Sequence, residues 1–539
     1  MRYTSRPMRF KRIINSAVWL AMLPFAWLVN RFAWTCDDAF ISFRYAKHLA
    51  RGDGLTFNPG ELPPVEGFTN LLWVLLLTPF EKLGVSLPLS ANLISAGSAL
   101  VLVVLVVQFL QRRGVSLWNA GACALIFVTL PPVGVWATSG LETMPFSLAI
   151  FGTYMALALG TGRSRVALAF LCAMTASLLR ADGALWCGFA FIASLASHNS
   201  QEEDAPARRA SQWKAVLSTG VLLSLGVALH FLWRHSYFGE WMPNTAKIKA
   251  GLSATRVERG LKYVGSLALA APAIALIPLL AIPFLARIRR SMGFGIGAIG
   301  FLGLAVLYTV FAGGDFMAMG RFLVPALPFL LLIFAATMES VGTRPLALAA
   351  STGLVALGLL GCFDRLNFSA DLRQALHFRW NRENARTELE QWAFMGEEVV
   401  ANSLLGKALA LHTQPGERLI RGNVGAVGYF SELYLLDVNG LVIPEVAAAA
   451  EVVERASPGH DRRVDPSFFR SWSPNYQFAI ILPKGVAPRF GLQDRWKSML
   501  NKGKLELERI PLREEDGFEP DTELRLLRDL RSGQEDDGE

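Results

Sequence analysis

Eleven long apolar stretches are the feature that most constrains how this 539-residue chain can fold. A helix needs about 20 mostly apolar residues to cross the hydrocarbon core of a bilayer. The stretches are close to that length and lie at residues 13–33, 88–110, 118–136, 143–160, 165–179, 184–198, 215–233, 261–286, 294–312, 322–340 and 345–362. We therefore predict an α-helical polytopic membrane protein with about 11 transmembrane helices.

Composition and charge support this class. Apolar residues make up 52% of the chain and charged residues only 18%, whereas soluble domains average about 25% charged residues. These values exclude a soluble enzyme, a disordered chain and a disulfide scaffold. The net charge of +8 comes mostly from Lys and Arg in short loops between the apolar stretches. That placement is a topology signal, so we expect no nucleic-acid partner.

The basic loops also set the orientation. Residues 68–83 are apolar too, but this stretch has only 16 residues and ends in an acidic and a basic residue. We assign it as an interfacial helix. The loops on the N-terminal side then contain Arg112, Arg113, Arg163, Arg165, Arg208, Arg209, Lys214, Arg287, Arg289, Arg290 and Arg344. By the positive-inside rule, the sequence predicts a multi-pass protein of the inner (plasma) membrane, with a cytoplasmic N-terminus and an extracytoplasmic C-terminal domain.

The chain divides into a membrane part and a more polar C-terminal part. Residues 1–12 carry five basic residues and no acidic residue, and no cleavage site follows, which indicates a retained first span. We predict a transmembrane catalytic domain over residues 1–365, with a large first outer loop at 34–87. Residues 366–530, with a helix-like stretch and the strand-like runs RLIRGN, LYLLDV and FAIILP, predict an extracytoplasmic soluble α/β domain. Residues 531–539 predict a disordered acidic tail.

The five cysteines show neither a CxxC motif nor metal-like spacing, so no metal site or redox motif is indicated and we expect no cofactor. The sequence leaves open whether a divalent ion binds in the outer loops. Cys36 and Cys362 both fall near outer ends of predicted spans. Spacing alone leaves open whether they pair as a disulfide.

Polar residues gather in the predicted outer loops. Asp37 and Asp38 follow the first span, and repulsion and desolvation near apolar surroundings would raise at least one pKa, as a general base requires. The alternative is that they cap the helix that follows. For the charged residues at span ends, Arg180, Asp182, Asp315 and Arg321, the alternative is snorkelling or a structural ion pair. For Lys247 and Lys249, the alternative is that they lie on the solvated face of a loop. The other candidates are Glu66, Asn70, Glu142, Arg180, Asp182, Asn244, Lys247, Lys249, Asp315 and Arg321.

Two functional classes fit such a chain. One is a transferase that uses a lipid-phosphate donor, and the other is a transporter or flippase of lipid-linked sugars. Transporters tend to show inverted repeats, broken helices and ionisable groups at mid-membrane depth. The sequence lacks these features, and its one-sided polar loops and external C-terminal domain favour chemistry at the membrane surface.

A series of motifs resembles a known family. In order, these are the acidic pair, RYA at 44–46, DGLTFNPG, VEGFTN, SGLET, RADG, FGEWMPNTAKIK and GGDFMAMGRF. The series resembles the GT-C glycosyltransferases that use polyprenyl-phosphate donors, and most of all the mycobacterial-type terminal arabinofuranosyltransferases. The similarity covers residues 30 to about 325, with a weaker echo at 424–441.

The resemblance implies a GT-C fold and transfer of a sugar, such as arabinofuranose or a related pentose, from a polyprenyl-phosphate donor at the outer leaflet. The acceptor would be an envelope glycan, lipid or protein. The first-loop acid would be the general base, here Asp37 or Asp38, and we favour Asp37 with Asp38 as helper. The phosphate-binding candidates are Arg180, Lys247, Lys249 and Arg321. The sugar- and acceptor-binding candidates are Glu66, Asn70, Glu142, Asp182, Asn244 and Asp315.

Overall fold

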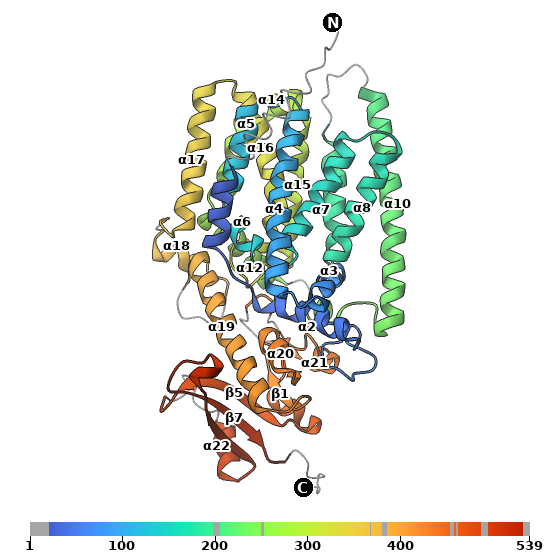
Figure 1. Ribbon diagram of the computed structural model, residues 1–539. Helices are drawn as coiled ribbons and strands as arrows, with labels where there is room; N and C mark the ends of the chain where they lie inside the picture. The colour runs from blue at the N-terminus through green and yellow to red at the C-terminus, as the bar shows by residue number, and fades with distance from the viewer. Residues whose placement is uncertain are drawn as a thin grey trace.

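The structure is a computed structural model that describes residues 21–197, 205–249, 253–366, 368–379, 385–452, 457–459, 462–486 and 494–531. A bundle of helices forms one end of the molecule, and a segment with helices and strands forms the other (Figure 1). The first described residues, 21–31, are helical and belong to the predicted first span. The predicted acidic tail lies outside the described residues, apart from Arg531.

Each later apolar stretch is helical. The bundle consists of α4 (Leu87–Arg112), α5 (Leu117–Phe127), α6 (Pro131–Ala137), α7 (Thr143–Leu159), α8 (Gly162–Leu179), α9 (Gly183–Leu195), α10 (Ala205–Phe238), α12 (Ala254–Ala270), α13 (Ala273–Ala281), η1 (Ile282–Phe284), α14 (Leu285–Ser291), α15 (Gly293–Ala312), η2 (Arg321–Ala326), α16 (Leu327–Val341) and α17 (Arg344–Cys362). Among the described residues, six helices, or up to eight if two bent pairs are single spans, are long and apolar enough to cross a membrane. The multi-span helical class is therefore confirmed, whereas the number eleven stays a prediction.

Two of the predicted straight spans are wrong in detail. The stretch 118–136 breaks between α5 and α6, which meet at 62°, and the stretch 261–286 breaks between α12 and α13, where the chain turns by 94°. A proline follows each break, and proline disfavours the helical conformation of the residue before it. Leu130 before Pro131 is extended, and Ala271 before Pro272 is also non-helical.

The centre of the bundle is apolar and aromatic. Helix α16 is buried along most of its length. The ring of Phe329 in α16 stacks on that of Phe301 in α15, with centroids 3.6 Å apart and planes 8° apart. Apolar and aromatic side chains of this kind fill the core of the bundle. The charged candidate residues lie at the ends of the helices.

One end of the bundle carries the elements of the predicted first outer loop. These are α2 (Asp37–Arg51) and α3 (Leu71–Lys82), and the short α11 (Asn244–Lys249) comes later in the chain. Helix α3 confirms a helix within the stretch 68–83. In Figure 1, α2 and α3 lie at the lower end of the bundle, whereas α14, with two of the predicted inner-loop arginines in its last turn, lies at the upper end. The two ends thus differ in the way the loop charges predict.

The C-terminal segment contains every strand of the described residues. Its elements are α18 (Ala370–Ala375), α19 (Glu388–His412), β1 (Arg418–Arg421), α20 (Gly425–Ser431), β2 (Tyr434–Asp437), α21 (Pro444–Ala449), β3 (Glu451–Val452), β4 (Arg462–Arg463), η3 (Pro466–Trp472), β5 (Tyr476–Pro483), α22 (Asp494–Asn501), β6 (Leu505–Pro511), η4 (Glu514–Asp516) and β7 (Thr522–Asp529). The main sheet has the order β2-β1-β5-β7-β6. Strand β1 pairs in parallel with β2 and β5, and β7 pairs antiparallel with β5 and β6. The three predicted strand runs are confirmed as β1, β2 and β5.

A buried arginine fastens this segment to the first loop. Arg44 of α2 donates from Nε to the carbonyl of Phe57, from Nη1 to that of Gly428 and from Nη2 to that of Leu433, each at 2.7 Å. A buried guanidinium is costly unless it is hydrogen-bonded, and here each of its nitrogens donates to a carbonyl. Helix α2 and the C-terminal segment are therefore packed as one unit around Arg44.

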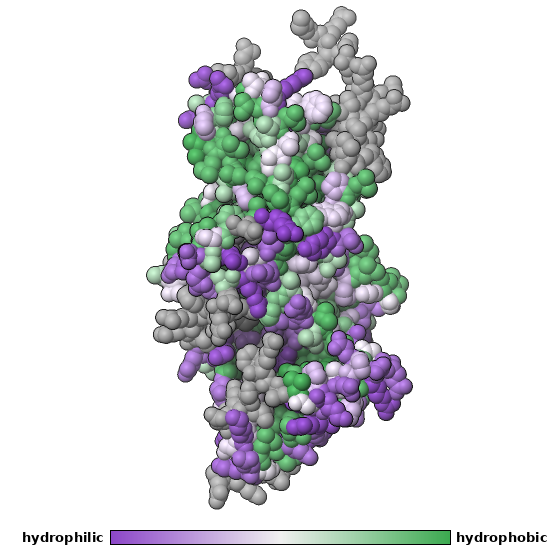
Figure 2. Space-filling model, turned by 90° about the vertical axis from the view of Figure 1, so that its left-hand side faces the viewer, coloured by the Kyte–Doolittle hydropathy of each residue, from purple (hydrophilic) through white to green (hydrophobic). Residues whose placement is uncertain are grey.

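The described cysteines are free thiols, and Cys36 and Cys362 are buried and unpaired with each other. The pairing that the sequence left open is therefore absent from the structure. Figure 2, which shows the side of the molecule that carries α17, has a largely apolar upper part and a mixed, more polar lower part. This distribution fits a bundle in a bilayer with a segment in water below it.

Candidate functional site

A buried carboxylate links three segments at the lower end of the bundle. Glu142 is the residue before α7, and its side chain is buried. Its Oε2 accepts a hydrogen bond from Nδ2 of Asn70 at 2.9 Å. Asn70 precedes α3 and also bonds the hydroxyl of Ser42 in α2, at 3.0–3.1 Å. The two helices of the first loop are thus tied to the start of α7 through polar side chains.

Two arginines approach the same carboxylate. Nη2 of Arg321 lies 3.2 Å from Oε1 of Glu142, and Nη1 of Arg180 lies 3.9 Å from it. Asp315 adds a second, longer ion pair to Arg321, at 3.9 Å. Nε of Arg321 is buried and has no hydrogen-bond partner. The Arg321 guanidinium therefore retains a donor that a bound anion would satisfy.

Arg180 is held more completely. Its Nε and Nη2 contact the two carboxylate oxygens of Asp182 at 2.9 and 3.0 Å. Asp182 also accepts hydrogen bonds from Tyr308 at 2.8 Å and from Trp186 at 3.0 Å. Burial alone would raise the pKa of Asp182, but the Arg180 guanidinium and these hydrogen bonds together lower it below its ordinary value. Asp182 is therefore an ionised group that orients Arg180.

Asp37 is engaged by the C-terminal segment. Its Oδ2 accepts a hydrogen bond from the backbone of Gly425 at 3.1 Å, and its Oδ1 accepts from the backbone of Ala426 at 3.1 Å and from Asn402 at 3.3 Å. Burial raises the pKa of Asp37 above its ordinary value, and the hydrogen bonds from Ala426 and Gly425 oppose this rise. Asp37 thus binds the first backbone amides of α20, as an N-cap side chain does.

The structure also corrects the capping alternative for α2. The N-cap residue of α2 is Cys36, which makes no side-chain capping bond, and Asp37 and Asp38 stand in the first turn. Carboxylates in the first turn interact favourably with the helix dipole. The side chain of Asp37 nevertheless reaches a different helix, α20, because that helix begins directly beside it.

Asp38 differs from its neighbour. It makes no hydrogen bond and no ion pair with the part of the chain that the structure describes, and it is half-buried. Burial raises the pKa of the neighbouring Cys36 thiol, the charge of Asp38 raises it further and the charge of Arg321 lowers it. Both charged groups thus lie within electrostatic reach of the same thiol. Within the described residues, neither carboxylate oxygen of Asp38 is therefore engaged by another protein group.

Not all predicted residues join this cluster. The structure brings together Asn70, Glu142, Arg180, Asp182, Asp315 and Arg321. Glu66 instead forms a buried ion pair with Arg234 of α10 at 2.8 Å. Asn244 donates to the carbonyls of Gly440 and Leu441 in the C-terminal segment. Lys247 and Lys249 fall in α11, but their side chains lie outside the described residues.

Several contributors escape prediction from the sequence. Tyr308 is a single hydroxyl near the end of an apolar run, which is a weak signal at best. Ser42 and Asn402 carry no signal, because each takes its role from a partner 28 and 365 residues away in the chain, respectively. Within the described residues, no group of three or more His, Cys, Asp or Glu side chains is arranged to hold a metal ion.

Comparison with known proteins places these features in context. A family model described as a domain of unknown function, DUF8728, matches residues 388–515. A terminal β-(1→2)-arabinofuranosyltransferase of Mycobacterium tuberculosis is 27% identical over 357 residues, which cover 57% of this chain and 53% of that protein. The protein of the same name from Corynebacterium glutamicum is 28% identical over 330 residues, covering 55% of this chain and 47% of that protein. The chain therefore spans about half the length of the curated relatives it matches.

The fold has a solved counterpart. The crystal structure of ArnT from Cupriavidus metallidurans bound to undecaprenyl phosphate aligns with a TM-score of 0.53 at 13% identity, and the alignment covers 95% of this chain and 97% of that one. At this identity the likeness shows the fold alone. The chain thus has the GT-C fold of ArnT and is related in sequence to the terminal arabinofuranosyltransferases, which confirms the family resemblance that its motifs indicate.

Proposed function

We propose that this protein is a membrane glycosyltransferase that moves arabinofuranose or a related pentose from a polyprenyl-phosphate donor to an envelope glycan, lipid or protein. Two observations carry the proposal: the Asp38 carboxylate has no partner among the described residues, and a buried network holds Arg321 against Glu142. A base and an anion-binding cation near one another are what sugar transfer from a phosphate needs. The named relatives and the fold of ArnT support the same reaction.

Arg321 is the proposed anchor of the donor phosphate. Its Nε has no partner, whereas Arg180 already uses two nitrogens on Asp182. A guanidinium matches a phosphate with two parallel donors, and it stabilises the anionic leaving group without a metal. The undecaprenyl phosphate bound to ArnT is a ligand of this kind. Lys247 and Lys249 remain candidates for a second phosphate contact.

Asp38 is the proposed general base. The sequence favours Asp37, but both oxygens of Asp37 already accept hydrogen bonds from Gly425, Ala426 and Asn402. In a base assignment geometry comes before pKa, because the carboxylate must reach the acceptor hydroxyl. Asp38 takes the proton of that hydroxyl while its oxygen forms a bond to the anomeric carbon. The bond from this carbon to the phosphate oxygen breaks, and the electron pair leaves with the polyprenyl phosphate.

The remaining polar residues divide between sugar binding and support. Glu142 and Asn70 face each other in the network and are the proposed partners of sugar hydroxyls. Asp182 and Asp315 orient the arginines. Glu66 and Asn244 fix the first loop and α11 against their neighbours, which is a supporting role. We place this site at the extracytoplasmic face of the plasma membrane, because the basic loops lie at the opposite end of the bundle.

The test is reconstitution of the purified protein in liposomes with decaprenyl-phosphoryl-arabinofuranose and an arabinan oligosaccharide. The expected product is heavier than the acceptor by one pentose. The Arg321→Gln variant should lose most of the transfer, whereas Arg289→Gln, at the other end of the bundle, should keep it. Transfer from a lipid-linked hexose only would contradict the donor assignment, and no transfer from any lipid-linked sugar, with pilin, lipopolysaccharide and capsule acceptors also offered, would contradict the function.

A further inference from the structure

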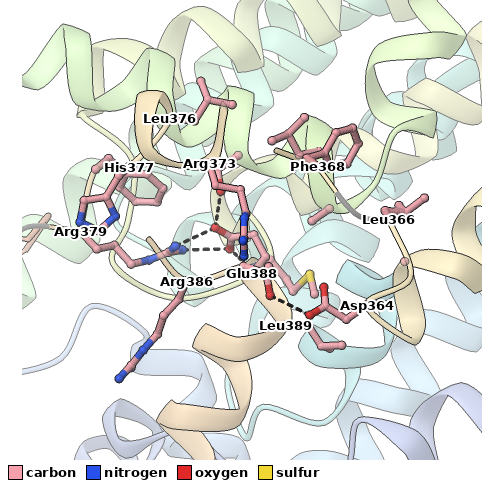
Figure 3. Close-up of a pocket in the computed structure, with 17 residues that line it drawn as sticks. Asp364, Leu366, Phe368, Arg373, Leu376, His377, Arg379, Arg386, Glu388 and Leu389 are labelled. Atoms are coloured by element: carbon pink, nitrogen blue, oxygen red, sulfur yellow. Dashed lines mark hydrogen bonds and ion pairs between the residues drawn. The ribbon is translucent and has the colours of Figure 1, made fainter. Parts of the chain in front are cut away.

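A small cavity lies apart from this network, between the bundle and the C-terminal segment. It has a volume of about 50 Å³ and is lined by residues of α12, the end of α17, α18 and the start of α19 (Figure 3). A single water needs roughly 10–15 Å³ of such space, so the cavity accommodates a group of a few water-sized parts, such as a phosphate.

One side of the cavity is a saturated ion pair. Arg379 donates from Nη1 and Nη2 to the two oxygens of Glu388 at 2.7 and 2.9 Å. Glu388 also accepts from the hydroxyl of Ser266 at 2.6 Å and from the backbone of Met319 at 2.7 Å. Arg379 donates further to the carbonyl of Phe316. Both charges are therefore satisfied within the protein and form a rigid wall.

Arg373 is different. Its Nε is buried and has no hydrogen-bond partner. In Figure 3 its guanidinium points into the space beside Glu388, whereas the Arg386 side chain extends away from the other labelled residues. Arg386 lies instead over the ring of Phe394, 3.8 Å from its centroid. Nη1 of Arg386 is also buried without a hydrogen-bond partner, but its side chain extends away from the labelled lining residues, so Arg373 is the better placed of the two to pair with a ligand in the cavity (Figure 3).

Exposed apolar side chains stand next to lining residues of the cavity in the chain. Phe363, just after α17, is 52% exposed, and Leu360 and Leu372 are 42% and 40% exposed. The Phe363 ring lies 5.5 Å from that of Trp27 in the first helix. Aromatic side chains of this kind gather at the level of lipid headgroups. The cavity lies where the last predicted span ends, next to α17 and α18.

We propose that this cavity binds the phosphate of an anionic membrane lipid, with Arg373 as the residue that pairs with it. The exposed apolar side chains of Leu360, Phe363 and Leu372 would contact the acyl chains, and the guanidinium would donate to the phosphate oxygens. Phosphatidylglycerol has this chemistry, and free phosphate shares the anionic group but not the chains. The proposal does not depend on the transferase reaction, because none of the proposed catalytic or donor-binding residues lines the cavity.

The experiment titrates short-chain phosphatidylglycerol into the full-length protein in a neutral detergent. Binding is measured as the shift in the thermal unfolding midpoint. Short-chain phosphatidylcholine and inorganic phosphate are the comparison ligands. Wild-type protein and Arg365→Gln, which changes an exposed arginine outside the cavity, should respond to phosphatidylglycerol alike. Arg373→Gln should bind it about tenfold more weakly, the loss expected from one charge-assisted hydrogen bond. Arg373→Lys should keep part of the response because it keeps the charge.

Equal responses of wild type and Arg373→Gln would overturn the site. A response to phosphatidylcholine as large as that to phosphatidylglycerol would overturn the role of the anionic group. If inorganic phosphate alone matched the lipid, the assignment to a lipid would be overturned. The unfolding midpoint of each variant is first measured without ligand, and only variants that are folded by this measure are compared.

Discussion

Asp37 and Asp38 are neighbours in the chain but have opposite surroundings. The side chain of Asp37 reaches the C-terminal segment, where two backbone amides and Asn402 bind its oxygens. The side chain of Asp38 has no such partner among the described residues. A pair of adjacent acids thus separates into an anchor, Asp37, and a carboxylate without a partner among the described residues, Asp38, which is the proposed general base.

This separation predicts different responses to substitution at position 37. Asp37→Ala leaves two buried amides without an acceptor, which costs about 1–3 kcal/mol for each such group. We expect a lowered thermal midpoint for Asp37→Ala. Asp37→Asn keeps an acceptor oxygen and should retain transfer to within about tenfold of wild type, because the general base is untouched. Loss of all transfer in a well-folded Asp37→Asn protein would instead make Asp37 the base.

The presence of polar residues at the candidate site could be predicted from the sequence, but their different contacts could not. Glu142, Arg180, Asp182 and Arg321 stand at span ends, and hydropathy alone brings such ends to one side of a membrane. The roles of Asp37 and Asn402 depend on a contact between segments 365 residues apart. Nothing in the local sequence around Asp37 encodes that contact.

At the scale of elements, the close approach of α20 to α2 is the critical contact. Gly425 begins α20, and a Cβ atom there would collide with the backbone oxygen of Asp37. Only glycine allows the two backbones to come so near. The sequence shows this glycine within the motif VGAVGY, but its partner is visible only in the fold.

We therefore predict that Gly425→Ala separates α20 from α2. The collision is with backbone, so the structure must shift, at a cost of about 1–3 kcal/mol typical of overpacked sites. The thermal midpoint and the transfer rate should both fall. Gly396→Ala in α19, where a Cβ atom would meet open space, is the matched control and should be neutral or slightly stabilising. Equal behaviour of the two variants would show that the α2–α20 contact is unimportant.

Helix ends were harder to predict than helices. The sequence shows Pro131 and Pro272, but the long apolar stretches at 118–136 and 261–286 predict uninterrupted spans. The backbone breaks at both positions because the residue before each proline leaves the helical conformation. Strands β1, β2 and β5 were easier, because short runs of apolar and β-branched residues stand between polar segments.

At the scale of the whole molecule, the basic inner-loop residues and the C-terminal segment lie at opposite ends of the helical bundle (Figure 1). Helix α14, whose last turn holds Arg289 and Arg290, lies at one end of the bundle, and the C-terminal segment lies at the other (Figure 1). The sequence predicts this difference between the two ends, because the length of each apolar stretch and the charge of each loop can be read from neighbouring residues. The sequence does not predict that the C-terminal segment packs against the first loop through Arg44.

This arrangement predicts the labelling of single cysteines. Ser164 and Ser471 are exposed. Ser164 lies in the first turn of α8, between the predicted inner-loop residues Arg163 and Arg165, and Ser471 lies in the C-terminal segment. In intact spheroplasts, a membrane-impermeant maleimide should label Ser471→Cys and should label Ser164→Cys only after permeabilisation. The wild-type protein is the background control because four of its five cysteines are buried. The reverse pattern would invert the proposed orientation.

The most direct test of the account compares Asp38→Asn with Asp53→Asn in the reconstituted transfer assay, together with donor binding. Asp53 is an exposed aspartate on the same loop. We predict that both variants bind the lipid-linked donor, that Asp53→Asn transfers pentose like wild type, and that Asp38→Asn loses at least about 100-fold in kcat, as removal of a general base requires. Transfer by a folded Asp38→Asn protein at the wild-type rate would contradict the account.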